Sequence, residues 1–469
     1  MSLESIAARA VEAVLATGAS DAEAFVDRTV EREIRVYDGG VESLTDATSS
    51  GVGVRAFLDG RWGYAYGTDA SEAGLTALAA AAREAAGVAD PDEHAGLPDE
   101  CGAADVGGLR SAELPTWTTE RKVDLALAVE RAARAHPSVT QVEQVVYADS
   151  DGEAALANSR GFAGSFESSA AWAYATAFAG EGADLMTGLG LGLGRGPEGL
   201  DAEAVGTEAA ERAAALAGAR QPASRRCPVV LDAFVAASFA GFIGGMLSAD
   251  AVQRGRSLFA GREGEEIADP LLRLVDDGTV ADGPATSPFD GEGSPRRRVP
   301  LVEDGRLLTF LFDARTGRKA GRGSTGSAAR SSYRTPPSVG ASNLIVEAAP
   351  GGAASGDPGG SASGGGAASG GGTLDDLVRR AGDGLYVADV AGLHSGVNPV
   401  SGTFSVGATG RLIEGGELAQ PVREITIASD LVSMLRAVEA IGSEARWVPF
   451  GGSVRAAPML LREMSVSGA

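Results

Sequence analysis

The chain is poor in the side chains that hold metals and form disulfides. Of its 469 residues only three are histidine and two are cysteine. Cys101 and Cys227 lie far apart and form no CxxC motif, which argues against a disulfide framework and favours a reducing compartment. His94, His136 and His394 have no helical spacing that would bring two of them together, and no HExxH motif occurs. The sequence therefore predicts no metal site and no cofactor in this chain.

Lysine and long apolar runs are also scarce. Only Lys122 and Lys319 are present, and the formal net charge is −23. A field of that sign repels phosphate backbones, and the one tight basic cluster, residues 296–298, is short, so we expect no direct nucleic-acid binding. No apolar run is long enough to span a membrane, and residues 1–18 lack the features of a secretory signal. These absences predict a cytoplasmic protein without a membrane segment.

Common catalytic motifs are missing as well. Neither a GxxxxGK[ST] phosphate loop nor a GxSxG nucleophile elbow occurs. Gly194, Gly196 and Gly199 spell GxGxxG, but with 67 glycines about one such match is expected by chance, and Pro197 interrupts it. Adjacent carboxylates such as Glu265 and Glu266 point apart on a strand or helix. An independent non-metal hydrolase that uses serine or carboxylate chemistry remains an alternative without a motif to support it.

The first half of the chain predicts an α+β domain, residues 1–218, with antiparallel hairpins. Ser2, Asp69 or Ser71, and Thr119 mark the starts of three helices, and a fourth is expected over 202–217. Asp59-Gly60 is a strong hairpin turn within 51–67. Further strands are expected in the segments 22–30, 33–36, 139–148, 153–158, 162–178 and 185–193.

The second half, residues 227–469, predicts a β-rich barrel or sandwich that carries a few helices. A strand over 228–231 and a small-residue helix over 233–248 come first, and a short helix is expected over 375–380. Strands are expected over 298–303, 306–313, 384–390, 404–410 and 411–418, with one late helix over 427–441. Residues 349–373 are almost wholly Gly, Ser, Ala and Pro, which predicts a flexible surface loop.

Long segments of the second half resemble the C-terminal domain of the TldD/PmbA family, also called the modulator of DNA gyrase family. The order of the first half, from AEAFVDRTVEREIRVYDGG onward, is similar to that family's first domain. The segments that carry the resemblance are RGRSLFAGREGEE (254–266), SPFDGEGSPRRRVPLVEDGRLLTFLFDARTGRKAG (287–321), PPSVGASNL (336–344), GVNPVSGTFSVGATGRLIEGGELAQPVREITIASDL (396–431) and VEAIGSEARW (438–447).

The resemblance also locates a degenerate catalytic slot. TldD-type members are described as carrying an HExxxH helix that binds the metal, with a later cysteine as third ligand, whereas PmbA-type (TldE-type) members lack it. Aligning the family's RG-x-S segment with residues 254–257 puts the histidine positions on Ala240 and Gly245 and the glutamate position on Gly241. None of these can bind zinc or accept a proton from water, and no cysteine follows residue 441. We therefore expect no catalytic residue here.

The resemblance implies a non-catalytic PmbA/TldE-like subunit, inactive alone, of a metalloprotease complex that acts on small or unfolded polypeptides. Zinc is then expected in a TldD-type partner, in a heterodimer, with a homodimer as the other arrangement and an extended peptide as substrate. Alternatives are a regulatory protein that acts on gyrase or a toxin–antitoxin system, and a natural-product tailoring homologue. Arg254, Arg256, Arg334 and Asn398 lie in family-like segments and are candidates to line the substrate groove, although buried arginines more often pair with carboxylates or carbonyls.

Overall fold

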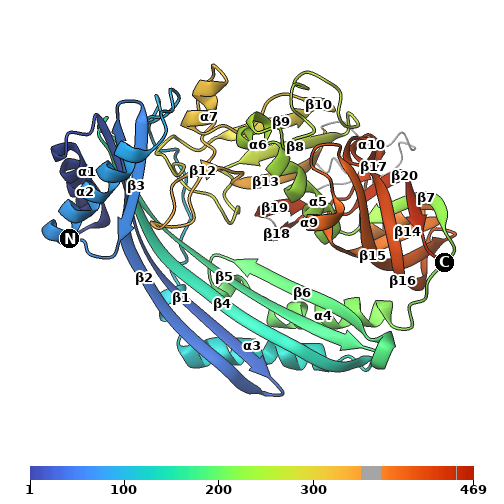
Figure 1. Ribbon diagram of the computed structural model, residues 1–469. Coiled ribbons are helices and arrows are strands. Elements are labelled where there is room, and N and C mark those ends of the chain that lie inside the picture. Colours follow the sequence, from blue (N-terminus) through green and yellow to red (C-terminus); the bar gives the residue numbers. More distant parts are fainter. Residues whose placement is uncertain (350–370, 450–451) are drawn as a thin grey trace, which may run out of the picture.

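A computed structural model describes residues 1–349, 371–449 and 452–469 of the chain. The predicted flexible loop over 349–373 lies almost entirely outside these residues, so that prediction stays a prediction. The fold is α+β, as predicted: a long curved sheet from the first half of the chain faces a β-rich second half (Figure 1). Among the described residues, no helix combines the length and the apolar character that crossing a membrane requires.

The curved sheet has six strands in the order β3-β2-β1-β4-β5-β6, and its neighbouring strands are all antiparallel. Its strands are β1 (Asp21–Tyr37), β2 (Gly40–Leu58), β3 (Arg61–Gly67), β4 (Val139–Asn158), β5 (Ala163–Ala179) and β6 (Met186–Gly194). The turn at Asp59-Gly60 is confirmed, and both residues have positive φ (52° and 72°), as a tight two-residue hairpin requires. The segments 22–30 and 33–36 belong to one strand, β1, and 139–148 and 153–158 belong to another, β4.

Two pairs of helices cover the outer face of this sheet (Figure 1). The first pair is α1 (Leu3–Ala16) and α2 (Glu72–Val88), and the second is α3 (Thr119–Arg134) and α4 (Ala202–Leu216). Ser2 and Ser71 cap the first two helices through their side-chain oxygens, as predicted. Helix α3 begins at Thr119, as predicted, and Thr118 caps it. The concave face of the sheet is turned toward the second half of the chain.

The second half holds a six-stranded sheet and a closed barrel. The sheet has the order β10-β9-β8-β13-β19-β18. The barrel has the order β16-β15-β14-β7-β20 and closes because β16 also pairs with β20, while β17 adds to β20. The strands of the sheet are β8 (Leu272–Asp277), β9 (Arg298–Glu303), β10 (Arg306–Leu307), β13 (Asn343–Ala348), β18 (Arg446–Val448) and β19 (Ser453–Ala456). Those of the barrel are β7 (Arg225–Leu231), β14 (Gly384–Ala391), β15 (Thr403–Glu414), β16 (Glu417–Asp430), β17 (Val438–Ile441) and β20 (Met459–Ser467).

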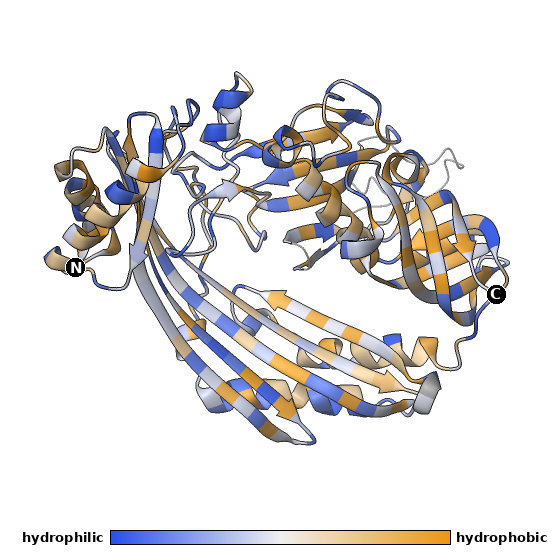
Figure 2. Ribbon diagram, viewed as in Figure 1, coloured by the Kyte–Doolittle hydropathy of each residue, from blue (hydrophilic) through white to orange (hydrophobic). Residues whose placement is uncertain are grey.

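Short helices and a two-stranded ladder connect these parts. The helices are α5 (Ala233–Met246), α6 (Ala249–Gln253), α7 (Ala314–Lys319), α8 (Leu374–Ala381), α9 (Leu393–Gly396) and α10 (Leu431–Arg436), and the ladder joins β11 (Ala328–Ala329) to β12 (Ser338–Val339). One large apolar core lies between the sheet, the barrel and α5. Apolar and polar residues alternate along many strands, as expected where one face of each strand packs on a core (Figure 2).

Three predicted elements of the second half are wrong. The late helix over 427–441 is mostly strand: β16 continues to Asp430, α10 has only six residues, and β17 follows. Ile425 and Ile427 are buried while the residues between and after them are less so, and this period of two belongs to a barrel strand. The expected strand over 306–313 ends at Leu307, and the expected break at 410/411 is instead a turn at Gly415-Gly416.

Candidate functional site

Helix α5 carries the three positions that the resemblance assigns to the degenerate slot, and its two faces have different surroundings. Asp232 starts the helix by accepting a hydrogen bond from the backbone N–H of Phe234 (2.9 Å). Ala240 is buried in the apolar core. Gly241 and Gly245 are four residues apart and share the opposite, groove-facing side of the helix. Positions 240 and 245 are five residues apart, which on a helix corresponds to directions about 140° apart. Side chains at Ala240 and Gly245 therefore do not point to the same place.

A small groove of about 250 Å³ runs along the glycine face of α5. Its walls come from α5, the segment after β12 and the start of β19, and its lining includes Gly241, Gly244, Gly245, Ser248, residues 339–341 and residues 452–454. A Cβ at Gly244 would lie 2.7 Å from the end of the Leu344 side chain, so a larger residue there would displace that side chain. A Cβ at Gly245 would meet no described atom within 4 Å. Position 245 therefore has room for a ligand side chain, but the chain supplies none.

A larger cavity of about 740 Å³ adjoins this groove, since Ser248 and Val339 line both. Its charged side chains are largely paired with one another. Arg254 lies 2.8 Å from Asp250, and Arg315 is paired with Asp92. Pro336 and Pro337 also line it. The groove and the larger cavity are therefore neighbours at the end of α5, and we call the two together the path past α5.

The four candidate groove residues do not form one cluster. Arg254 lines the larger cavity, whereas Arg256 follows α6 and is exposed. Arg334 lies over the ring of Tyr333 (5.1 Å). Asn398 accepts hydrogen bonds from the backbone N–H groups of residues 400 and 401 (2.9 and 3.1 Å), so its side chain shapes a turn. Arg254 alone lines the path described above.

The three histidines belong to separate segments. His94 lies 3.5 Å from Glu93 in the loop after α2, and His136 accepts from the backbone N–H of Ser138 (3.2 Å). His394 belongs to α9. Within residues 1–349, 371–449 and 452–469, no three His, Cys, Asp or Glu side chains gather in a way that could hold a metal ion. The side chains at the slot, an alanine and two glycines, do not fit zinc because they carry no donor atom.

A buried charge cluster joins the two halves of the molecule, and sequence patterns do not predict it. Arg55 of β2 donates to Glu23 of β1 (3.1 and 2.5 Å) and to Glu292 in the loop before β9 (3.0 Å). Arg330, which follows β11, also donates to Glu23. All four side chains are almost fully buried. The cluster therefore holds the root of the β1–β2 hairpin against the second half of the chain.

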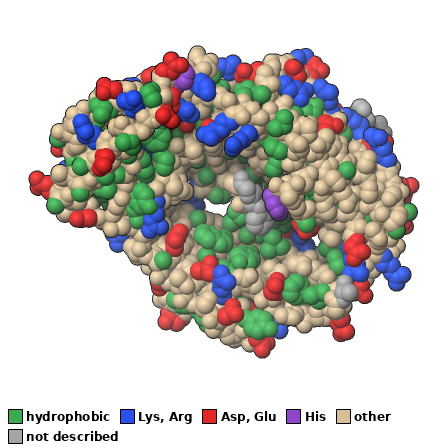
Figure 3. All heavy atoms as spheres, viewed as in Figure 1, with side chains coloured by type: hydrophobic (Ala, Val, Ile, Leu, Met, Phe, Trp, Pro, Cys, Tyr) green, Lys and Arg blue, Asp and Glu red, His purple; other side chains and the backbone are tan. Residues whose placement is uncertain are grey.

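Burial and neighbouring charges give the two carboxylates of this cluster different proton affinities. Burial acts to raise the pKa of Glu23, but the guanidinium groups of Arg55 and Arg330 outweigh it and leave the pKa below its usual value. Burial raises the pKa of Glu292 to about 7, because Arg55 offsets it only in part. The cluster fixes the halves around a central hollow, which Figure 3 shows between the curved sheet and the second half.

Comparisons with known proteins agree with this architecture. Three family profiles match in order: PmbA/TldA metallopeptidase domain 1 over residues 22–86, the central domain over 112–217, and the C-terminal domain over 224–468, which is more than half of the chain. The metalloprotease PmbA of Escherichia coli O157:H7 is 27% identical over 470 residues, covering 99% of this chain and 96% of that protein.

Solved structures show the same fold. TldE from Thermococcus kodakarensis superposes with a TM-score of 0.84 at 21% identity, covering 98% of this chain and 100% of that one. A Thermotoga maritima protein, named for modulation of a DNA gyrase, superposes with a TM-score of 0.86 at 24% identity, covering 99% and 100%. From the matched domains, the chain belongs to the PmbA/TldD family of metalloprotease-like proteins.

Proposed function

We propose that this chain is the non-catalytic subunit of a two-component metallopeptidase that acts on small or unfolded polypeptides. One observation carries the proposal: the groove face of α5 presents Gly241 and Gly245 where TldD-type members are described as carrying an acid and a metal ligand. Metal-assisted hydrolysis needs protein ligands and a base beside the bound water. In this proposal a TldD-type partner supplies the zinc, and this chain supplies part of the wall around the substrate.

The tip of the β1–β2 hairpin is the surface we propose for that partner. Residues 41–51 of β2 pair with β1 on one side, and β3 takes up the other side only from Val52 onward. Within the part of the chain that the structure describes, that side of residues 41–51 has no neighbouring strand. Leu44 and Val41 are 43% and 48% exposed on this segment. A free strand edge with exposed apolar side chains favours pairing with a second chain.

The shape of the path past α5 supports an extended polypeptide as substrate. The path combines a narrow groove with a wider cavity; β12 borders both, and β19 borders the groove. An extended peptide can hydrogen-bond to such segments as an added strand, whereas a folded domain does not fit a groove of about 250 Å³. This geometry supports the proposal that the substrate is selected by its chain conformation.

The test is co-expression with the same organism's HExxxH-bearing paralogue. We expect a complex of the two chains that holds metal in the paralogue only and cleaves unfolded casein in a chelator-sensitive way. We expect Leu44→Arg to weaken the complex at least about tenfold, because it places a charge in the interface core. Val88→Arg is the matched control, since Val88 is exposed (84%) at the end of α2.

Other results would point elsewhere. Tight stoichiometric zinc in the isolated chain, with activity lost on its removal, contradicts the proposal. Chelator-resistant hydrolysis by the isolated chain favours an independent non-metal hydrolase. Co-purification with a gyrase subunit or an antitoxin, without any peptidase partner, favours a regulatory protein. A stable homodimer that does not bind the paralogue would indicate that the hairpin tip mediates self-association.

A further inference from the structure

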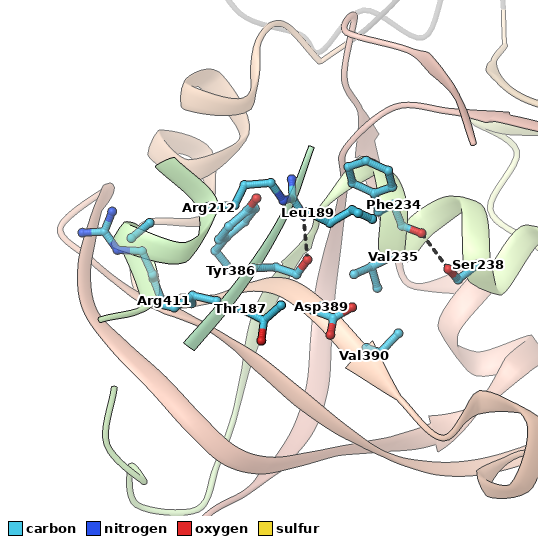
Figure 4. Close-up of a pocket in the computed structure, with 13 residues that line it drawn as sticks. Thr187, Leu189, Arg212, Phe234, Val235, Ser238, Tyr386, Asp389, Val390 and Arg411 are labelled. Atoms are coloured by element: carbon cyan, nitrogen blue, oxygen red, sulfur yellow. Dashed lines mark hydrogen bonds between the residues drawn. The ribbon is translucent and has the colours of Figure 1, made fainter. Parts of the chain in front are cut away.

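A second cavity, of about 290 Å³, opens beside the N-terminal half of α5 (Figure 4). It lies between α4 and β6 of the first half and strands β14 and β15 of the barrel. Its apolar wall is formed mainly by Leu189, Leu216, Val235 and Val390. A cavity that combines apolar walls with a few polar groups is the usual form of a small ligand pocket.

The buried charges behind this cavity are neutralised. Both terminal nitrogens of Arg212 donate to Asp232 (3.2 Å each), and Tyr386 donates its hydroxyl to the same carboxylate (2.6 Å). Arg212 also donates to the carbonyl of Ala388 (3.0 Å). These contacts leave no uncompensated charge in that part of the wall, so the network supports the cavity rather than attracting an ion.

Asp389 differs from the other charged groups of the cavity. No cation lies within ion-pair distance of its carboxylate among the described residues. Asp389 is exposed and lines the cavity. Partial desolvation raises the pKa of its carboxyl above the usual value, although the backbone N–H of Val390 and the charge of Arg212 act to lower it. Arg411 lines the opposite end, where its guanidinium donates to the carbonyls of Leu418 and Ala419 (2.9 and 3.0 Å) and is turned away from Asp389 (Figure 4). A cationic group that enters the cavity could therefore form an ion pair with the Asp389 carboxylate.

The cavity and the glycine groove lie along the same side of α5. Phe234, Ser238, Gly241 and Gly245 are spaced four, three and four residues apart, which places them on one stripe of a helix. Phe234 and Ser238 line the cavity, and the two glycines line the groove. Seven residues of helix separate Ser238 from Gly245, about 10 Å, which an extended peptide covers in about three residues.

We propose that this cavity is a specificity pocket for a protonated amine carried on an apolar stem, with Asp389 as its counter-ion. Two parts of a peptide have that chemistry: a lysine side chain, and a free N-terminus next to an apolar residue. The stem would pack on Leu189, Val235 and Val390, and the peptide backbone would continue along α5 toward Gly245. This inference rests on the proposed function, because it assumes that an extended peptide lies in the path past α5.

Binding of short peptides to the full chain tests the pocket. Isothermal titration calorimetry would compare acetyl-Leu-Ala-Lys-Ala-Leu-amide with the same peptide carrying Nε-acetyl-lysine or norleucine. A fourth peptide, the norleucine form with a free N-terminus, separates the two sources of the amine. We expect a charged amine at one of these two places to strengthen binding at least about tenfold. Asp389→Asn should remove that preference, and Asp105→Asn, at an exposed site in the loop before α3, should leave it intact.

Each remaining outcome contradicts the pocket. Equal affinities for all four peptides, no measurable binding, or a preference that survives in Asp389→Asn would each show that the cavity does not select an amine. Cleavage by the complex with the paralogue is the separate readout for the proposed function. If that complex cleaves casein while the chain described here shows no preference for an amine, the proposed function is supported and the specificity pocket is contradicted.

Discussion

The two ends of the β1–β2 hairpin share the same strands and the same hydrogen-bond ladder, yet they have opposite surroundings. At the root, Glu23 and Arg55 are almost fully buried under the second half of the chain. At the tip, Arg32 and Asp46 form an equally short ion pair (2.5 Å) with side chains that are 21% and 48% exposed. Pairing of strands is therefore not what distinguishes the two ends; burial is. Removing one partner of an ion pair lowers the stability of the protein most where the other partner stays buried without water.

The largest expected effect comes from breaking the ion pair at the root. Arg55→Met should lower the free energy of unfolding by about 3–5 kcal/mol, because Glu23 and Glu292 would lose a buried partner. Arg32→Met at the tip should cost less than about 1 kcal/mol, as exposed pairs do. Denaturant unfolding of both variants measures the contrast. Equal losses would mean that burial does not separate the two ends.

An intermediate effect is expected from apolar side chains on the same strand. Val54 of β2 is 1% exposed and Val41 of β2 is 48% exposed. Val54→Ala removes buried methyl groups and should cost about 2–3 kcal/mol, whereas Val41→Ala should stay within about 0.5 kcal/mol. Thermal and denaturant unfolding would record both. A large loss from Val41→Ala in the isolated chain would show that the tip is already covered there.

The smallest expected effect is a pH dependence of the free energy of unfolding, and it comes from Asp27, which lies between the root and the tip of the hairpin. Burial raises the pKa of Asp27 to about 6, and its carboxylate accepts from the backbone N–H of Tyr333 (3.1 Å). Between about pH 4 and pH 6 the folded state holds more protons than the unfolded state, so Asp27 lowers the stability of the protein as the pH rises through this window.

Asp27→Asn should remove that loss, because an amide oxygen still accepts the hydrogen bond and does not ionise. Relative to the unmodified chain, the free energy of unfolding of the variant should be unchanged near pH 4 and higher by about 1 kcal/mol at pH 8, after allowance for solvent screening of a partly exposed group. Urea unfolding across this range measures it. A difference that is the same at every pH would contradict the assignment.

Local patterns predict most elements of the first half, but they do not explain why β6 is rich in glycine. The alternating glycines of this strand let α4 approach it closely. A Cβ at Gly188 or Gly190 would lie 2.2 or 1.9 Å from a backbone carbonyl oxygen of that helix. The sequence shows the glycines but not the helix that packs on them, because that contact is tertiary.

Contacts between distant segments set the limit of prediction for the site. The slot on α5 follows from aligned motifs, and Arg254 does line the adjoining cavity. The cluster of Glu23, Arg55, Glu292 and Arg330 joins residues up to 307 positions apart, and nothing local marks them. The same holds for the late helix predicted over 427–441, where the pairing of β16 with β20 outweighs local helix preference.

The closure of the barrel has a consequence for how the chain folds during synthesis. All strands of the curved sheet have left the ribosome once residue 194 emerges, so this sheet can form early. Strand β7 emerges next, yet its neighbours are β14 and β20, which end at residues 391 and 467. Until β14 has emerged, β7 carries buried-type side chains such as Val229 and Val230 without a strand on either side, and until β20 has emerged one side stays open. A ribosome stalled before β20 would therefore hold a finished first half beside an open, aggregation-prone second half.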